Sequence, residues 1–301
     1  MTIVGVVGYG EVGRILAEDL RARGTGVVAY DVKLDPSGSR GTGQRVPLVE
    51  HAAAHGVRLV ADHVAVAALA DLVISAVTAD QAVAVADAVA PGLDEGTFVL
   101  DLNSASPRAK QRAAEAVNAV GGRYVEGAVM TSVPPHRLDV PILLGGPDAS
   151  SLAPLLADLG FTAATAHDER LGVTSASKLC RSVVIKGMEA LFIESLVAAR
   201  HHGVEDEVLA SLTETFPGID WDAQASYFFA RATQHGRRRA DEMDEAADTV
   251  AAAGIEPWSS RATAQRQRWV ADLAQAGTIE PTPDWRASAD RILKEDPHGP
   301  R

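Results

Sequence analysis

The sequence predicts an α/β protein in which a doubly wound parallel sheet is followed by an all-α C-terminal domain. In the first half of the chain, short runs of Val, Ile and Leu alternate with Ala-rich stretches of helical character. These apolar runs are continuous, which is typical of parallel strands that are buried on both faces. After about Thr165 the pattern indicates helices alone. A length of 301 residues suits two domains, and we place them at residues 1–166 and 167–301.

The apolar runs and the helical stretches can be assigned in chain order. Strands are expected at Ile3 to Val7, Val27 to Tyr30, Leu72 to Ala76, Thr97 to Leu100, Tyr124 to Ala128 and Ile142 to Leu144. Helices are expected from Glu11 to Arg23, from Ala79 to Val89 and from Leu171 to Ala199. Ser106 followed by Pro107 has the pattern of a helix start. The repeated strand–helix–strand order implies right-handed crossovers and an open sheet.

Composition and charge exclude several classes of function. The net charge of −12 argues against nucleic-acid binding, and an anionic substrate must be attracted by a local basic cluster. The most apolar segment, His63 to Val77, contains Asp71 and is too short to span a membrane. The N-terminus lacks the features of a signal peptide, and the single cysteine, Cys180, excludes an intrachain disulfide. We therefore expect a cytoplasmic protein with no membrane contact, and a Cys180 that is packed in a helix.

A glycine-rich motif lies between the first predicted strand and the first predicted helix. It consists of Gly8, Tyr9, Gly10, Glu11, Val12 and Gly13. Gly8 allows a tight turn, Gly10 lets the backbone approach a pyrophosphate, and Gly13 lets the helix pack on the strand. The helix N-terminus then presents N–H groups to the phosphates. The sequence thus predicts a Rossmann domain that binds a dinucleotide.

Residues after the second and third predicted strands complete the predicted cofactor site. Asp31 closes the second strand, where a carboxylate accepts hydrogen bonds from ribose hydroxyl groups and repels a 2′-phosphate. This favours NAD. A loop from Lys33 to Arg45 follows, and its basic residues could instead bind the phosphate of NADP; these are Lys33, Arg40 and Arg45. Val77 and Thr78 are expected to line the cofactor.

Three further segments resemble motifs of the β-hydroxyacid dehydrogenases, the family of 6-phosphogluconate and 3-hydroxyisobutyrate dehydrogenases. They contain Asp101, Asn103, Ser104 and Pro107, then Met130-Thr131-Ser132, and then Gly172 and Lys178. The resemblance covers about the first two thirds of the chain, and the helical remainder resembles a less characterised branch related to phosphogluconate dehydrogenase. It implies an NAD(P)-dependent oxidoreductase that acts on a small hydroxy acid or the matching carbonyl compound, with Lys178 as the catalytic acid/base.

The substrate half of the resembling motifs departs from the family pattern. Thr174 stands where a second glycine is usual, and Arg181 and Ser182 replace the asparagines after the lysine. Met130-Thr131-Ser132 replaces Ser-Gly-Gly. The resemblance therefore implies the class of reaction and a small, anionic substrate, but no particular substrate.

The chemistry also follows from the residues themselves. Oxidation of an alcohol by hydride transfer requires removal of the hydroxyl proton, which a lysine accepts when desolvation and a positive nicotinamide ring lower its pKa. Ser182 lies one helical turn from Lys178 and can bind the substrate there, whereas Glu189 balances charge further along. Asn103 and Ser104 follow a strand, where open α/β sheets bind ligands, and are expected to hold the substrate. No residues near Cys180 suggest a metal site.

Two basic segments remain open to two interpretations. The run from His235 to Arg239, which contains Arg237 and Arg238, could clamp a carboxylate or phosphate group. It could equally be a solvated helix start balanced by the acidic residues Asp241, Glu242, Asp244 and Glu245, which we favour. The same two interpretations, an anion clamp or a solvated segment, apply to His136 and Arg137.

Two other functions compete with the dehydrogenase. Imine reductases share the predicted architecture but usually lack the lysine, so Lys178 argues against reduction of a C=N bond. A dinucleotide-binding sensor without catalysis is the third hypothesis, which the altered residues around Lys178 keep open. Helical second domains in this architecture expose a broad apolar surface, so we expect a homodimer.

Overall fold

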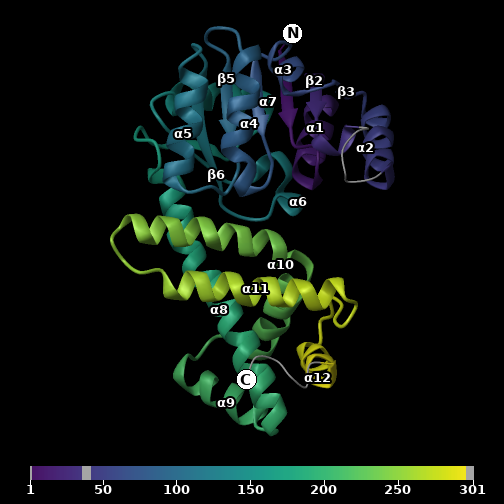
Figure 1. Ribbon diagram of the computed structural model, residues 1–301, viewed down its shortest axis with the longest axis vertical. Coiled ribbons are helices and arrows are strands. Elements are labelled where there is room, and N and C mark those ends of the chain that lie inside the picture. The colour runs from purple at the N-terminus through teal and green to yellow at the C-terminus, as the bar shows by residue number, and fades with distance from the viewer. Residues whose placement is uncertain (1, 36–41, 296–301) are drawn as a thin grey trace. The chain divides into compact units, whose positions relative to one another are not determined.

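The protein consists of two compact units, Met1–Lys178 and Leu179–Arg301, in a computed structural model that describes residues 2–35 and 42–295 (Figure 1). The units meet inside helix α8 (Val173–His202), beyond the predicted boundary after residue 166. The first turn of α8 belongs to the first unit because Glu126, in that unit, binds its backbone N–H groups.

An eight-stranded sheet forms the centre of the first unit, in the order β3-β2-β1-β4-β5-β6-β7-β8. The strands are β1 (Ile3–Val7), β2 (Gly26–Tyr30), β3 (Arg58–Leu59), β4 (Leu72–Ser75), β5 (Phe98–Asp101), β6 (Arg123–Val129), β7 (Ile142–Gly145) and β8 (Ala164–Asp168). Only β6 and β7 pair antiparallel within this sheet, which departs from the wholly parallel sheet that we predicted. The edge strands β3 and β8 were not predicted, since β3 has two residues and β8 is largely exposed.

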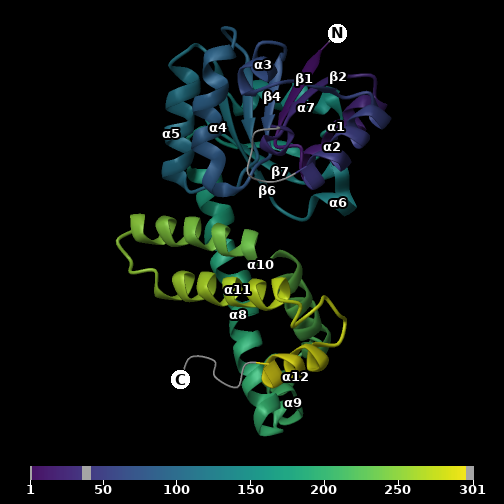
Figure 2. The ribbon, with the colours of Figure 1, turned by 45° about the vertical axis from the view of Figure 1, so that its right-hand side comes forward.

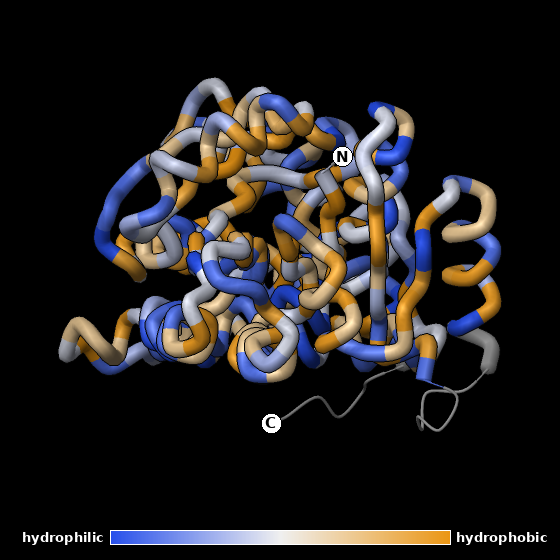
Figure 3. The backbone as a smooth tube through the Cα atoms, turned by 90° about the horizontal axis from the view of Figure 1, so that it is seen from above, coloured by the Kyte–Doolittle hydropathy of each residue, from blue (hydrophilic) through white to orange (hydrophobic). Residues whose placement is uncertain are grey.

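Helices cover both faces of this sheet (Figures 1 and 2). One hydrophobic core packs against α1 (Glu11–Ala22), α2 (Thr42–His55) and α7 (Ala149–Leu159), and the other against α3 (His63–Ala67), α4 (Ala82–Val89) and α5 (Pro107–Asn118). Hydrophobic and hydrophilic stretches alternate along the chain (Figure 3), as expected of helices that bury one stripe. Two packed helical layers around a sheet confirm the predicted fold class.

The predicted elements of the first unit agree closely with the observed ones. Ser106 caps α5, since its Oγ accepts a hydrogen bond from the N–H of Ala109 at 3.4 Å. The predicted loop from Lys33 to Arg45 is different: the 3₁₀ turn η1 (Val32–Leu34) includes its first two residues, and α2 already begins at Thr42. Short elements not named above are η2 (Ala79–Gln81), η3 (Ala90–Gly92), α6 (Val133–His136) and η4 (Arg137–Asp139).

The second unit is helical in the part of the chain that the structure describes. After α8 come α9 (Glu205–Thr215), α10 (Trp221–Ala252), α11 (Trp258–Gln275) and α12 (Trp285–Glu295). Its core is built on Trp221 and Trp285, which pack with Phe229 and aliphatic side chains. No helix in the described residues is both long enough and apolar enough to cross a membrane.

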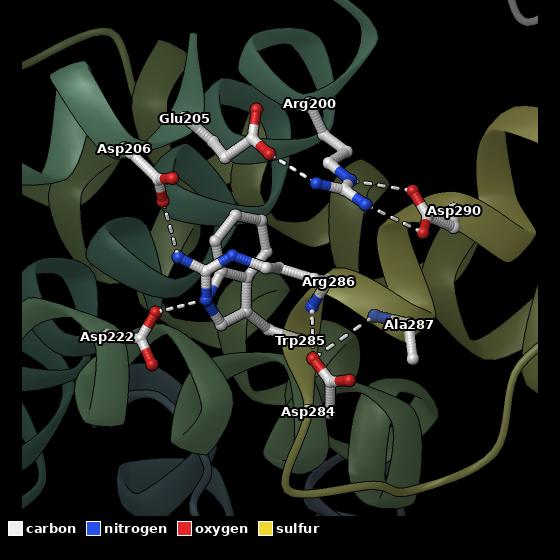
Figure 4. A network of polar contacts seen from close by, with 9 residues as sticks. All are labelled: Arg200, Glu205, Asp206, Asp222, Asp284, Trp285, Arg286, Ala287 and Asp290. Carbon is white, nitrogen blue, oxygen red and sulfur yellow. Dashed lines mark hydrogen bonds and ion pairs between the residues drawn. The ribbon is translucent and has the colours of Figure 1, made fainter. Parts of the chain in front are cut away.

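A network of ion pairs joins the last helix to its neighbours (Figure 4). Arg286 on α12 contacts Asp206 of α9 at 2.8 Å and also binds Asp222 of α10. Arg200 on α8 binds Asp290 of α12 at 2.7 Å, which lowers the pKa of the Asp290 carboxyl group. Exposed pairs contribute little individually, but a network that converges on α12 fixes its position.

The long helices α10 and α11 approach closely at a glycine. A Cβ atom at Gly236 of α10 would lie 2.7 Å from the carbonyl oxygen of Gln267 and 2.9 Å from Cβ of Ala271. Gly187 of α8 is different, because a Cβ atom there would have a single neighbour within 4 Å among the described residues, Oγ1 of Thr263 at 3.9 Å. Gly236 therefore sets the spacing of the two helices, whereas Gly187 only weakens its own helix.

We expect Gly236→Ala to lower the free energy of unfolding by about 1–2 kcal/mol, because overpacking exceeds the gain in helix propensity. The matched substitution Gly187→Ala should raise it by about 0.5–1 kcal/mol. Urea unfolding followed by circular dichroism measures both. Equal stabilisation by the two substitutions would contradict this account of the α10–α11 contact.

Candidate functional site

The glycine-rich turn between β1 and α1 has the geometry that the motif predicts. Gly8 has φ +89°, and a Cβ atom there would lie 2.4 Å from the carbonyl oxygen of Ala76. A Cβ atom at Gly13 would lie 2.0 Å from the carbonyl oxygen of Gly8. Gly10 differs, since no atom of the described residues lies within 4 Å of its Cβ position. Two of the glycines are thus required by packing, and the third faces open space into which a ligand fits.

In the described part of the chain, no side chain caps the N-terminus of α1. Gly10 occupies the N-cap position and provides no side-chain acceptor, whereas Asp62, Ser106 and Asp220 cap α3, α5 and α10. Uncapped N–H groups and the positive end of the helix dipole favour an anion. The turn therefore fits the diphosphate of a dinucleotide, which Gly8, Gly10 and the first turn of α1 would hold.

The other motif residues differ in what they offer a cofactor. The Tyr9 side chain is fully buried, and its hydroxyl group lies 2.9 Å from Nδ1 of His51. Burial raises the pKa of Tyr9 to about 12. Tyr9, predicted as a cofactor residue, therefore has only its backbone available for that role. Glu11 is exposed in the first turn of α1, and Val12 is partly buried against the core.

Asp31 lies buried at the end of β2. Its Oδ1 accepts a hydrogen bond from the N–H of Lys33 at 2.9 Å, which caps the short turn η1 and fixes the carboxylate. Lys33 is partly buried and Arg45 is exposed on α2, whereas Arg40 lies outside the described residues. The predicted position of Asp31 at the strand end, as required for contact with a ribose, agrees with the structure.

Val77 and Asn103 connect the glycine turn to the end of β5. A Cβ atom at Gly8 would lie 2.7 Å from Cγ1 of Val77, so these segments are in contact. The N–H of Val77 donates to Oδ1 of Asn103 at 2.7 Å, and the Asn103 amide donates to Oγ of Ser75 at 2.9 Å. Asn103, predicted to bind substrate, thus also holds the ends of β4 and β5 together. Thr78, next along the chain, is exposed.

A buried ion pair supports the loop that follows β5. Nζ of Lys110 lies 2.9 Å from Oδ1 of Asp101, and the Tyr124 hydroxyl donates to Oδ2 of Asp101 at 2.6 Å. Oδ1 of Asp101 also accepts from the N–H of Asn103 at 2.8 Å. Burial raises the pKa of Tyr124 well above its usual value, and the nearby negative charge of Asp101 adds to this effect. The phenol therefore stays protonated and acts as a hydrogen-bond donor.

Glu126 determines where α8 begins. In the sheet, Asp101 pairs with Glu126, Glu126 with Gly145, and Gly145 with Asp168, so the chain leaves β8 beside the Glu126 carboxylate. That carboxylate is buried, and its oxygens accept hydrogen bonds from three backbone N–H groups at the start of α8. The donors are Gly172 at 2.8 Å, Thr174 at 3.3 Å and Ser175 at 3.3 Å. A carboxylate in this place caps the helix and complements its dipole.

Lys178 lies in the second turn of α8, and its amine reaches the loop after β5. Nζ of Lys178 donates a hydrogen bond to Oγ of Ser104 at 2.7 Å, and both side chains are partly buried. Thr174, one turn earlier, is fully buried, and its hydroxyl oxygen has no hydrogen-bond partner among the described residues. Two of the predicted site residues, 74 positions apart in the sequence, are therefore in direct contact.

The predicted site residue Ser182 belongs to the second unit. Its hydroxyl group accepts a hydrogen bond from Nζ of Lys186 at 3.1 Å, and Lys186 also contacts Glu242 at 2.6 Å. Glu189 is fully buried, where Arg239 binds both of its oxygens and Gln267 donates to it at 3.1 Å. Glu189 thus balances charge, as expected, and Ser182 has an internal partner.

Most of the basic segments are used for internal pairing. Arg237 binds Asp272, Arg239 binds Glu189, and Arg238 lies 3.9 Å from Glu242. Glu242 is one of the acidic residues predicted to balance the run, whereas Asp272 and Glu189 lie elsewhere in the chain. Burial, together with nearby arginines, lowers the pKa of His235 to about 4, so its ring is neutral at pH 7.

Arg137 and Cys180 differ in how they are placed in the structure. Arg137 is held by Asp19 of α1 through hydrogen bonds of 2.5–2.9 Å, which favours a structural role over an anion clamp, and His136 is exposed. The expectation that Cys180 is packed was wrong, since the structure exposes it. Cys180 lies two residues after Lys178 and therefore on a different face of α8.

Glu126, Lys110 and Tyr124 hold the site together, although the sequence predicted no role for them. Each carries a weak signal in retrospect. Glu126 is an acidic residue inside the otherwise apolar stretch Tyr124 to Val129, and Lys110 is a lysine on the inner face of α5. A charged residue at such a position needs a buried partner, but the sequence alone does not identify it.

Comparison with protein families matches both parts of the chain. A model for the NAD binding domain of 6-phosphogluconate dehydrogenase matches residues 3–164. A domain of unknown function matches residues 199–270. A search of curated proteins finds no match.

Solved structures match over nearly the whole chain. A conserved hypothetical protein from Sinorhizobium meliloti 1021 is 36% identical, with a TM-score of 0.75, and the match covers 98% of this chain and 96% of that one. A conserved protein of unknown function, described as structurally similar to 3-hydroxyacid dehydrogenases, is 29% identical, with a TM-score of 0.67. The match covers 92% of this chain and 100% of that one. The 3-hydroxyisobutyrate dehydrogenase of Mycobacterium tuberculosis shares the fold, at 18% identity, a TM-score of 0.66, and coverage of 97% and 99%. An imine reductase from Streptomyces aurantiacus also shares it, at 21% identity, a TM-score of 0.53, and coverage of 98% and 100%.

Glu126→Gln should loosen the start of α8. The amide nitrogen of glutamine cannot accept a hydrogen bond from the N–H of Ser175, so we expect the free energy of unfolding to fall by about 1–2 kcal/mol. Glu115→Gln, an exposed change on α5, is the control and should have no effect. Urea unfolding measures both variants. Unchanged stability in Glu126→Gln would show that the carboxylate does not hold the helix in place.

Proposed function

We propose that this chain, which belongs to the β-hydroxyacid dehydrogenase family, is an NAD(P)-dependent oxidoreductase that interconverts a small hydroxy acid and the matching carbonyl compound, with Lys178 as its general acid/base. One observation carries the proposal: the amine of Lys178 donates to Oγ of Ser104 at 2.7 Å, beside the carboxyl ends of the central strands. Open α/β sheets bind ligands at that edge.

Continuous contacts link this lysine to the predicted cofactor turn. Ser104 follows Asn103, Asn103 binds the N–H of Val77, and Val77 packs against the Gly8 turn. The uncapped α1 N-terminus and the open space above Gly10 suit a diphosphate at the same edge. The proton acceptor and the dinucleotide turn therefore belong to one site within the first unit.

A bound nicotinamide ring would accept the hydride in the oxidative direction. The Lys178 amine, in its neutral form, takes the proton of the substrate hydroxyl group as the C–H bond breaks and the C=O bond forms. The Ser104 hydroxyl group, which accepts a hydrogen bond from this amine, orients it. In the reductive direction the ammonium group returns the proton to the carbonyl oxygen. Asn103 acts as a positioning residue, because its side chain is bound to Val77 and Ser75.

NAD is the proposed cofactor, with NADP as the alternative. The buried carboxylate of Asp31 is fixed by the N–H of Lys33 at the end of β2. In this place it would accept hydrogen bonds from the ribose hydroxyl groups and repel a 2′-phosphate. Lys33 and Arg45 supply the positive charge that the alternative requires.

Reduction of a C=N bond is the second candidate, since the fold also occurs in an imine reductase. Lys178 favours the first candidate, because a lysine held at the strand ends suits proton exchange with a hydroxyl group. A dinucleotide sensor without catalysis is the third. A dehydrogenase would turn over hydroxy acids, an imine reductase would reduce imines, and a sensor would turn over neither. A panel of substrates therefore separates the three candidates.

Lys178→Ala should reduce the turnover of small β-hydroxy acids by about two orders of magnitude or more, while leaving dinucleotide binding intact. Lys294→Ala, an exposed change on α12, is the control. Steady-state assays with NAD and with NADP measure both variants, and we expect a higher kcat/KM with NAD. Full activity in Lys178→Ala would refute the catalytic role. Turnover of cyclic imines alone would support the second candidate, and tight NADH binding without any turnover would support the third.

We also propose that the protein is a homodimer. Apolar side chains are exposed on the second unit, among them Val184 and Leu191 seven residues apart on α8, and Trp258 on α11. Exposed apolar surface of this kind is typical of protein interfaces. Light scattering on the purified protein in solution should give a mass of twice that of one chain, which is 31.5 kDa. A mass of one chain at micromolar concentration would contradict the proposal.

A further inference from the structure

Three potential metal ligands gather where α2 packs against α1. His51 and His55 lie one turn apart on α2, so their rings project from the same face and approach to 4.4 Å between centroids. Glu18 projects from α1, and its Oε2 lies 4.0 Å from Nε2 of His51. One ligand atom from each of the three residues lies within 4.8 Å of the others. All three side chains are partly buried in the first unit.

Neighbouring groups hold two of these ligands in a binding orientation. The Tyr9 hydroxyl group lies 2.9 Å from Nδ1 of His51, which leaves Nε2 of that ring directed towards Glu18. Arg137 lies 3.2 Å from Oε1 of Glu18, so that Oε2 is the oxygen that faces His51. Partners on the far atoms of ligating histidines and carboxylates are the usual supports of a metal site.

From this geometry we propose that Glu18, His51 and His55 bind a divalent transition-metal ion, for which Zn²⁺ is the best match. Two imidazole nitrogens and one carboxylate oxygen form a ligand set that suits Zn²⁺, with a fourth position left for water, and they do not suit Ca²⁺ or Mg²⁺, which prefer oxygen ligands. Zinc–ligand distances of about 2.0–2.2 Å place the ligand atoms closer together than 4.0 Å, so small side-chain rotations complete the site.

Bound metal would connect two parts of the dinucleotide-binding unit. It would join α1 to α2, and through His51 and the Tyr9 hydroxyl group it would reach the glycine-rich turn. The guanidinium groups of Arg14 and Arg137 add positive charge nearby, so we expect an affinity of micromolar order, weaker than that of a structural zinc site. The proposal does not depend on the reaction that the protein catalyses.

Zn²⁺ titration of the full chain, treated first with a chelator, tests the proposal by calorimetry and by thermal unfolding. We expect one ion per chain and a rise in Tm. His55→Ala should weaken binding at least 10-fold, and Tyr9→Phe, which retains every ligand, should weaken it by about 10-fold through the loss of support for His51. The control is His167→Ala, which removes an exposed histidine of the same unit and should leave binding unchanged.

Co²⁺ provides a second readout, because the intensity of its visible absorption reports a tetrahedral site with nitrogen ligands. We expect those bands in the wild-type chain and their loss in His55→Ala, with circular dichroism confirming that the variant is folded. Two results would overturn the proposal: binding of Zn²⁺ that is equal in His55→Ala and wild type, or no saturable binding by the wild type at concentrations up to about 100 times the expected micromolar Kd.

Discussion

The cap that Glu126 forms on α8 is the interaction on which the proposed chemistry depends. This carboxylate is buried in the sheet, yet it accepts hydrogen bonds from the N–H groups of Gly172, Thr174 and Ser175. Burial of an ionised group is costly unless hydrogen bonds compensate for its lost hydration, and the open end of a long helix supplies them. The cap fixes both the starting point and the direction of α8. A displacement of one residue at this point would rotate Lys178 away from Ser104 by about 100°.

Sheet register brings the parts of the site together. The central strands end at the same edge, which aligns the glycine turn after β1, Val77 after β4, and Ser104 after β5. Strand β7 runs antiparallel to β6, and β8 runs parallel to β7. The last residue of β8, Asp168, is therefore level with Glu126 in the register of the sheet. Lys110 and Tyr124 anchor Asp101 below the loop that carries Ser104. A buried ion pair of this kind contributes little net stability, and it fixes a geometry instead.

In the second unit, buried charged side chains of α8 form ion pairs with side chains of α10. Along α8, Lys186 pairs with Glu242 and Glu189 with Arg239, both partners lying on α10. Removal of either partner would leave a charge buried without compensation, so these pairs define how the two helices align. Of the basic run on α10, Arg239 pairs in the interior, whereas Arg237 and Arg238 lie on the surface. Gly236 within that run lets α11 approach.

The sequence by itself determined the fold class, the glycine-rich turn, and the positions of the six inner strands and of α1, α4 and α8, because these depend on local periodicity and on residues adjacent in the chain. It also identified Lys178 and Ser104 as separate candidates, through resemblance of their segments to a family. Only the tertiary structure decided that the two side chains touch and that Asn103 braces strands. It likewise showed that Tyr9 turns into the core towards His51. Such contacts join residues dozens of positions apart, and they follow from strand register and helix packing, which residue order alone does not specify.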